Sequence, residues 1–276
     1  MSSWVDTVLQ WPLSVSVAAL VALSALVSWL ATRAVRRVWP HPAFKDNHEL
    51  VGFTYAVYGL IYGVLLAFTI VVAWQRFAET EQLVMHEATL LSELWRDSVV
   101  ARPVMRDDIE RNLIAYAQSV IDDEWPAMAH GRAHPQTERL YERLWALTYH
   151  FEPSTKIQEA YMAEFLARMN ELSAARRLRV LHSRMEIHGV LWMVLVIGAL
   201  PTVAYPLLFS SKHAWVQVAI TGSIMMIVTL GLLVTLSLQT PFSGEVSIAP
   251  DAFRQVLESF HRRLLTDPAG LNPISP

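Results

Sequence analysis

Four polar side chains share one face of an otherwise apolar stretch in the first third of the chain. They are Tyr55, Tyr58, Tyr62 and Thr69. Their spacing places them on one side of an α-helix, because side chains three, four or seven residues apart lie above one another. Uncharged polar and aromatic groups on one face could line a narrow, partly dewetted ion pore. The alternative is a buried aromatic face whose hydroxyls donate to carbonyls of a neighbouring helix, and the residues by themselves favour this alternative.

A second face of the same stretch carries only small residues, at steps of four, three, four and four. They are Gly52, Ala56, Gly59, Gly63 and Ala67. Gly59 and Gly63 form a Gly-x-x-x-Gly pair, which lets two membrane helices approach closely. The small-residue stripe therefore predicts helix packing, and a pore lined by small residues is the alternative.

The sequence contains no recognisable catalytic pattern. It has no Cys, which excludes disulfides, a thiolate nucleophile and Cys-bound zinc. A Gly-rich phosphate loop, a His-Glu-x-x-His zinc motif and a nucleophile elbow are absent from the sequence. We therefore predict that the protein is not an enzyme and that it needs no cofactor.

Two kinds of polar cluster could attract a cation, but neither predicts a metal site. His130 and His134 belong to a loop with Gly131 and Pro135, which gives them no fixed helix face, and no further ligand is identifiable. We expect surface histidines there. Six acids form two runs, namely Asp107, Asp108 and Glu110, then Asp122, Asp123 and Glu124. We expect both runs to be solvated helix ends, the first at a helix N-terminus.

The elements that position the tyrosines and the small-residue stripe are membrane-spanning helices. Hydrophobic residues make up 53% of the chain and charged residues 17%, which is too apolar for an ordinary soluble domain. Four stretches contain no Asp, Glu, Lys or Arg and reach the length of about 20 helical residues that crosses a bilayer. They are Leu13–Thr32, Val51–Gln75, Ile187–Ser211 and Trp215–Gly244. The sequence therefore predicts an all-α, multi-pass membrane protein with four transmembrane helices.

The composition of these spans also narrows the function. Apart from His188 at the edge of the third span, they contain no ionisable group of the kind that proton- and ion-coupled transporters keep on the transport path. A passive channel is compatible with this composition. We expect Pro201 and Pro206 to kink or break the third span. The first span lacks the basic segment of a signal peptide and is expected to be retained.

Residues 76–186 form a polar region with helical periodicity. The second span continues without a helix breaker, so we expect one helix up to about Val100. After Pro103, apolar residues at helical spacing predict three more helices, the first of which should end at Asp122–Pro126. Thr155 and Gln158 are spaced as a capping box for the last helix, which could continue directly into the third span. We therefore expect a helical bundle outside the membrane.

The predicted organisation has five parts. They are a first span with a basic loop (1–50), a second span (51–75), the bundle (76–186), the third and fourth spans (187–244) and a tail (245–276). In the tail, Asp251–Leu265 is expected to form a short helix that docks on the bundle. Flanking basic residues give conflicting orientations: Arg33, Arg36, Arg37 and Lys45 favour an extracytoplasmic bundle, whereas Arg176, Arg177, Arg179 and Arg184 favour a cytoplasmic one.

Several motifs carry a family resemblance. Those in the first three quarters of the chain are Gly52-Phe53-x-Tyr55-Ala56-Val57-x-Gly59-Leu60-Ile61-Tyr62-x-Val64-Leu65-Leu66-Ala67-Phe68, Glu87-Ala88, Glu124-Trp125-Pro126-x-Met128 with Gly131 shortly after, and Leu191-Trp192. The most specific is the tail motif Pro241-Phe242-x-Gly244-x-x-x-Ile248-x-Pro250-x-x-Phe253. Together they resemble the bestrophin-like bacterial membrane proteins, a family distantly similar to the bestrophin anion channels. The resemblance covers about residues 45–260.

The resemblance implies a multi-pass protein of the bacterial inner membrane. Bestrophins are pentameric anion channels with four spans per subunit, cytosolic helical regions and a neck lined by apolar residues of the second span. The resemblance therefore implies a homo-oligomer, a pentamer if the bestrophin analogy holds, and a cytoplasmic bundle. The calcium-binding acidic cluster that follows Pro-Phe-Gly in animal bestrophins is missing, since only Glu245 and Asp251 are nearby and Ser243 interrupts the motif. Calcium gating is not expected.

Two functions from different classes follow. The first is an oligomeric anion channel for small inorganic ions, with the second span around the axis. Its pore would run along the tyrosine face or along the small-residue stripe. The second is a non-conducting membrane sensor or scaffold whose bundle binds a ligand or a partner protein. The family resemblance favours the channel.

Overall fold

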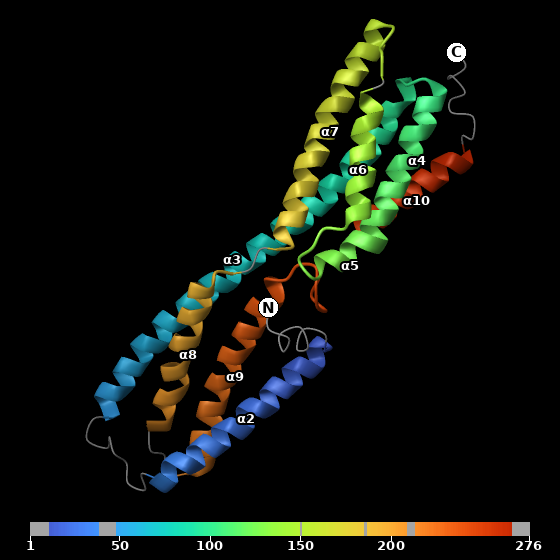
Figure 1. Ribbon diagram of the computed structural model, residues 1–276. Helices are drawn as coiled ribbons and strands as arrows, with labels where there is room; N and C mark the ends of the chain where they lie inside the picture. Colours follow the sequence, from blue (N-terminus) through green and yellow to red (C-terminus); the bar gives the residue numbers. More distant parts are fainter. Residues whose placement is uncertain (1–10, 39–47, 150, 185–186, 209–212, 267–276) are drawn as a thin grey trace. The chain divides into compact units, whose positions relative to one another are not determined.

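The computed structural model describes residues 11–38, 48–149, 151–184, 187–208 and 213–266, and these ranges contain helices and no strand (Figure 1). The α-helices are α2 (Leu13–Val38), α3 (His48–Asp97), α4 (Pro103–Ser119), α5 (Trp125–Met128), α6 (Pro135–Thr148), α7 (Lys156–His182), α8 (Gly189–Leu208), α9 (Ala214–Leu238) and α10 (Asp251–Thr266). A 3₁₀ turn, η2 (Ser98–Val100), and a π-helical turn, η3 (Val120–Glu124), complete the set. The predicted all-α class is confirmed.

The chain divides into two compact units. We call the first the membrane unit; it contains residues 1–77, 186–240 and 244–246. The second, the bundle unit, contains residues 78–185, 241–243 and 247–276. Helix α3 contributes residues 48–77 to the membrane unit and 78–97 to the bundle unit. The five-part division expected from the sequence stays a prediction.

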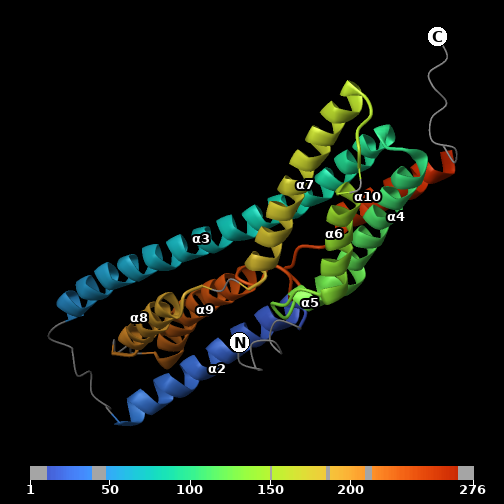
Figure 2. The same ribbon diagram turned by 45° about the horizontal axis from the view of Figure 1, so that its top comes forward.

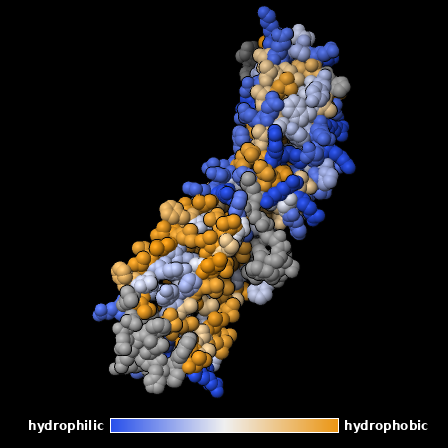
Figure 3. All heavy atoms as spheres, turned by 60° about the vertical axis from the view of Figure 1, so that its left-hand side comes forward, coloured by the Kyte–Doolittle hydropathy of each residue, from blue (hydrophilic) through white to orange (hydrophobic). Residues whose placement is uncertain are grey.

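Four helices are long and apolar enough to cross a bilayer, which confirms the predicted spans. They are α2, the apolar part of α3, α8 and α9. Hydrophobic side chains cover much of the membrane unit on the face shown in Figure 3, whereas hydrophilic side chains predominate on the bundle unit. Within the membrane unit, α2 runs alongside α9, and α3 packs on α8 and α9 through Tyr62, Leu66, Leu195 and Val228 (Figure 2).

The bundle unit is built from the second part of α3 and helices α4, α6, α7 and α10. Leu91, Leu94, Leu113 and Met169 are essentially inaccessible in its core. Helix α10 docks through Phe253 and Phe260, and Phe260 stacks on Trp95 with ring centroids 4.3 Å apart. The predicted tail helix is therefore confirmed, as is the long helix, which ends at Asp97.

Two expected helix boundaries differ from the structure. The segment Asp122–Pro126 does not end the helix, because a π turn leads from α4 into α5 and Pro126 occupies a first-turn position where no N–H is needed. Helix α7 does not continue into the third span but ends at His182. There the Ser183 hydroxyl donates to the carbonyl of Val180 (2.7 Å) and satisfies a helix-end acceptor.

The predicted capping box of α7 is half formed. Thr155 accepts from the backbone N–H of Gln158 at 3.2 Å, as a helix N-cap should. The side chain of Gln158 accepts from the N–H of Ser154 rather than from that of Thr155. In a complete capping box the Gln158 side chain would accept from the N–H of the N-cap residue, Thr155. Here it accepts from the N–H of the residue before it.

Candidate functional site

The tyrosine face of α3 lies against α8 within one chain. Tyr62 is 4% exposed. The Tyr58 hydroxyl donates to the carbonyl of Gly198 (3.3 Å), and the Tyr55 hydroxyl donates to that of Thr202 (3.4 Å). Both rings lie about 6 Å from the ring of Tyr205, centroid to centroid. Tyr55 and Tyr58 thus use hydroxyl-to-carbonyl bonds between helices, the arrangement that the sequence favoured for a buried aromatic face. The buried hydroxyl of Tyr62 departs from it, because it has no hydrogen-bond partner in the described part of the chain.

Thr69 ends this face without reaching another helix. Its side chain is buried, and its hydroxyl donates to the carbonyl of Leu65 at 2.9 Å, one turn back on α3. This local bond satisfies the hydroxyl in an apolar surrounding. Whether Thr69 and the three tyrosines border a pore in an assembly stays a prediction.

The small-residue stripe lies open in a single chain. A Cβ added to Gly59 or Gly63 would meet no atom within 4 Å among the residues that the structure describes. Large apolar side chains stand beside the stripe and are strongly exposed, and they are Phe53, Val57, Leu60, Val64, Phe68 and Val71. The predicted packing of the stripe on another helix would therefore need a partner from outside this chain.

The close contacts of α3 depend on glycines of the other spans, which the sequence did not single out. A Cβ on Gly198 of α8 would lie 2.7 Å from a ring carbon of Tyr62. A Cβ on Gly231 of α9 would lie 2.7 Å from Leu66. Each glycine therefore makes room for one large side chain of α3. No periodic pattern marks an isolated glycine in a fully apolar helix, so the sequence alone gave no signal.

A seam of hydroxyl groups joins α2 to α9. On α2, the buried polar residues recur at multiples of four, and they are Ser16, Ser24, Ser28 and Thr32. Ser28 donates to the carbonyl of Val218 at 2.9 Å, and the hydroxyl of Ser24 lies 3.3 Å from that of Thr229. The spacing of these residues was a readable signal for a packed helix face.

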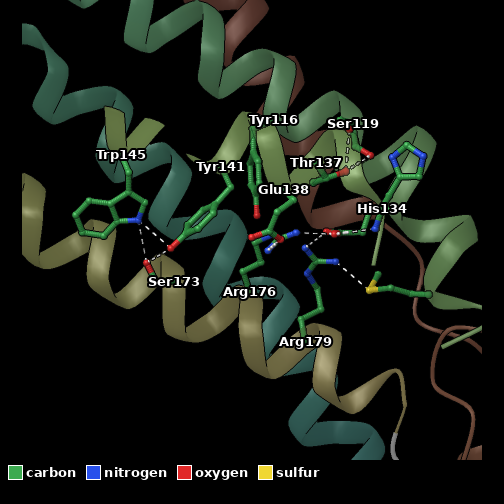
Figure 4. A network of polar contacts seen from close by, with 12 residues as sticks. Tyr116, Ser119, His134, Thr137, Glu138, Tyr141, Trp145, Ser173, Arg176 and Arg179 are labelled. Atoms are coloured by element: carbon green, nitrogen blue, oxygen red, sulfur yellow. Dashed lines mark hydrogen bonds and ion pairs between the residues drawn. The ribbon is translucent and has the colours of Figure 1, made fainter. Parts of the chain in front are cut away.

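The bundle unit contains a buried network of charges centred on Arg179 of α7 (Figure 4). Arg179 is fully buried. Its guanidinium binds Glu87 of α3 through Nε at 2.6 Å and Glu124 of η3 through Nη2 at 2.7 Å. Both carboxylates are also inaccessible to solvent. Burial by itself lowers the pKa of Arg179, but Glu87 and Glu124 outweigh burial and raise it well above its usual value.

Two more side chains extend the network. Arg176 joins the second oxygen of Glu124 (2.8 Å) to Glu138 of α6 (2.6 Å). Figure 4 labels Arg176 and Glu138. The hydroxyl of Tyr116 donates to Glu87 at 2.7 Å. Burial, and then the charge of Glu87, raise the pKa of Tyr116 well above its usual value, so the phenol stays a donor. The network thereby links α3, α4, α6, α7 and η3.

The residues of the tail motif lie on this network. Trp125 Nε1 donates to the carbonyl of Ile248 at 3.0 Å, and its ring meets those of Phe242 and Phe253 edge-on. The guanidinium carbon of Arg179 lies 5.8 Å from the ring centroid of Trp125 and 5.7 Å from that of Phe253. Motif residues far apart in the sequence therefore meet around one cation.

The backbone explains other motif positions. Ile248 N–H donates to the carbonyl of Pro241 at 2.8 Å, which closes the loop between α9 and α10. Gly244 has φ +83°, a conformation that other residues adopt rarely, so this position requires glycine. Pro250 directly precedes α10, where its carbonyl accepts from the N–H of Arg254.

The prediction of solvated helix ends was wrong for Glu124, and also for the first acidic run, which follows the first turn of α4 and contains the buried Glu110, paired with Arg106 at 2.7 Å. Glu124 is fully buried because the π turn directs it toward Arg176 and Arg179. Single π turns are common at functional sites. His130 is exposed as expected, whereas His134 is partly buried. In the ranges that the structure describes, no group of three or more His, Asp or Glu residues could hold a metal ion.

Comparisons with known proteins agree with this architecture. The Bestrophin-like domain family matches residues 18–253. A crystal structure of a bacterial bestrophin homologue from Klebsiella pneumoniae aligns with a TM-score of 0.62 at 14% identity, covering 91% of this chain and 99% of that chain. A single-residue variant of that homologue aligns with a TM-score of 0.65 at 12% identity, covering 90% and 99%. No protein of curated function matches by sequence.

The chain is therefore a helical membrane protein with the bestrophin fold. It belongs to the bestrophin-like family, because the family match extends over most of its length. At such low identity the likeness to the Klebsiella pneumoniae structures shows the fold alone.

Proposed function

We propose that the protein is a homo-oligomeric anion channel of the bacterial inner membrane, with α3 lining the pore. Membership of the bestrophin-like family supports this function, as do four spans that carry no charged side chain. A pore of this kind relies on backbone dipoles, hydroxyls and apolar constrictions rather than on a titrating relay. We propose no catalytic role and no bound cofactor.

The side of α3 opposite the tyrosines faces the pore axis. This assignment rests on how differently the two sides of α3 are exposed within one chain. Tyr58 and Tyr62 lie against α8, whereas Leu60 and Phe68 are each 68% exposed and Val64 is 46% exposed. The small-residue stripe is thus a better candidate for the pore lining than the tyrosine face. It would let copies of α3 approach, with the apolar row beside it as an anion gate.

Cysteine substitution tests this assignment cleanly, because the natural sequence has no Cys. Leu60→Cys, Val64→Cys and Phe68→Cys would each be reconstituted in liposomes and assayed for chloride flux. A negatively charged thiosulfonate reagent is expected to block flux in at least one of them. Ile220→Cys on α9, where the native side chain is 53% exposed, is the matched control and should be unaffected.

The assembly itself is tested by the mass of the purified protein in detergent. A pentamer would have five times the 31.2 kDa subunit mass. A monomer or a dimer provides no axis ringed by copies of α3 and would overturn the channel proposal. The sensor or scaffold function, in which the bundle binds a ligand or partner, would then take its place.

A further inference from the structure

Helix α8 lacks two of its own hydrogen bonds because it contains Pro201 and Pro206. Proline has no backbone N–H, so the carbonyl four residues earlier loses its helical donor. Pro206 thereby releases the carbonyl of Thr202, and Pro201 releases that of Ile197. In a lipid surrounding such a carbonyl needs another donor, since no water is available to replace the missing bond.

Helix α3 supplies a donor at one of these positions. The hydroxyl of Tyr55 donates to the carbonyl of Thr202, the acceptor that Pro206 releases. Tyr58 lies one turn away and donates to the carbonyl of Gly198, which neither proline releases because Thr202 follows four residues later and has an N–H. The Gly198 carbonyl also receives the Thr202 hydroxyl at 2.8 Å. Tyr55 thus donates to a carbonyl that has lost its helical N–H donor, whereas Tyr58 donates to a carbonyl that keeps one.

We propose that Tyr55 is a positioning residue that replaces the helical bond missing at Pro206 and holds the last turn of α8 to α3. The bond at 3.4 Å is long, and it can open without breaking any helical bond of α8. The segment 202–208 is consequently the part of α8 that can tilt away from α3. The proposal deepens the channel function, on which its effect on conduction rests, because α3 is the helix assigned to the pore.

A double-mutant cycle tests the pairing directly. Tyr55→Phe removes the hydroxyl and keeps the ring, whereas Pro206→Ala restores an N–H for the Thr202 carbonyl. In the natural background, Tyr55→Phe is expected to shift the thermal unfolding equilibrium roughly two- to tenfold, the effect of one hydrogen bond. In the Pro206→Ala background the same substitution should have a much smaller effect. Equal effects in both backgrounds would overturn the proposal.

Two matched variants separate the bond from general packing. Tyr58→Phe should have the same effect with Pro206 or with Ala at that position, because its acceptor is not the released carbonyl. Pro201→Ala should leave the effect of Tyr55→Phe unchanged, because it restores a bond to Ile197 only. If either control shows the same coupling as Tyr55 with Pro206, the proposal is wrong.

Hydrogen exchange gives a second measurement that needs no proline variant. In Tyr55→Phe, the backbone amides of residues 203–205, 207 and 208 should exchange several-fold faster than in the natural protein, and those of 189–197 should not change. Unchanged exchange in 203–208 would overturn the proposal.

Chloride flux completes the test and separates the two proposals. A change of flux in Tyr55→Phe that Pro206→Ala reverses supports the positioning role. Coupled stability in a protein that conducts no anion would retain the Tyr55 pairing and reject the channel. Flux that is unaffected by Tyr55→Phe would reject the positioning role in conduction.

Discussion

The membrane unit and the bundle unit bury polar side chains by different chemistry. Between α2 and α9 the neutral hydroxyls of Ser24 and Ser28 bond to another hydroxyl and to a carbonyl across the helix contact, whereas the buried hydroxyl of Thr32 has no hydrogen-bond partner among the described residues. In the bundle unit the buried groups are full charges, with Arg179, Glu87 and Glu124 all inaccessible to solvent. Loss of one neutral hydrogen bond costs about 1 kcal/mol, whereas a buried charge that loses its partner costs about 3–5 kcal/mol.

This difference shows where each unit is sensitive to substitution. The membrane unit depends on many weak contacts, including close approaches at Gly198 and Gly231. The bundle unit depends on a few strong ones, because Arg179 alone contacts α3, η3 and two aromatic rings. Substitutions should therefore have graded effects in the first unit and abrupt effects in the second.

The largest effect is expected from Arg179→Met. The substitution leaves Glu87 buried without its guanidinium and leaves Glu124 with Arg176 alone. Breaking a buried ion pair in this way costs about 3–5 kcal/mol of unfolding free energy in comparable cases. Thermal unfolding of the purified protein, followed by circular dichroism, measures the loss. Arg177→Met, at the exposed neighbouring position, is the control and should change the midpoint little.

A companion variant shows whether the network stabilises the bundle or specifies its arrangement. Replacing Glu87, Glu124 and Arg179 together by apolar residues of similar size removes all three charges. This variant should be much more stable than Arg179→Met, because no unpaired charge remains. If both variants were equally destabilised, lost packing rather than unpaired charge would be the cause.

The second largest effect is expected from Gly198→Ala. The added methyl group would lie 2.7 Å from the ring of Tyr62, and overpacking of this kind costs about 1–3 kcal/mol. Gly59→Ala is the matched control, because nothing in the described part of the chain lies within 4 Å of the added Cβ. Gly59→Ala should preserve the fold of each subunit. A reduced oligomer mass in this variant alone would indicate that copies of the chain meet at the stripe.

Comparison of these glycines shows how far the sequence could predict the site. The charge-free stretches and the 3.6-residue period determined the spans and the bundle helices, because length and amphipathicity are properties of the chain itself. Which glycine touches which side chain depends on the angle between two helices. The Gly-x-x-x-Gly pair of α3 was therefore noticed, whereas Gly198 and Gly231 were missed.

The burial of Glu124 was missed for a similar physical reason. A run of three acids before Trp125 has the composition of a solvated helix end, and only the π turn places its last member inside the bundle. Its partners Arg176 and Arg179 lie far along the chain, on α7. The family motif Glu124-Trp125-Pro126 was the one available signal, and it carried no information about the partner.

A smaller effect is expected from Ser28→Ala in the α2–α9 seam. The substitution removes the bond to the carbonyl of Val218, and interhelical hydrogen bonds in membranes contribute about 0.6 kcal/mol on average. Ser14→Ala, at an exposed position on the same helix, is the control. A loss above about 3 kcal/mol would contradict the contrast between the two units, because it would make one hydroxyl as important as a buried charge.

The smallest effect concerns Asp97, at the end of α3. Its side chain is 7% exposed, and burial raises its pKa although Arg168 pairs with it at 2.6 Å and opposes the shift. The folded protein therefore holds this proton more tightly than the unfolded chain does. The contribution of Asp97 to the unfolding free energy is complete below the pKa of the unfolded chain, about 3.9. It is lost as the pH rises through the higher pKa of the folded protein.

Asp97→Asn should remove that part of the pH dependence. The measurement is the thermal midpoint of both proteins from pH 4 upward, with Glu142→Gln as a control for loss of an exposed charge. The advantage of the natural protein over Asp97→Asn should shrink as the pH rises through this window. If the advantage grew with pH instead, the ion pair with Arg168 would dominate over burial.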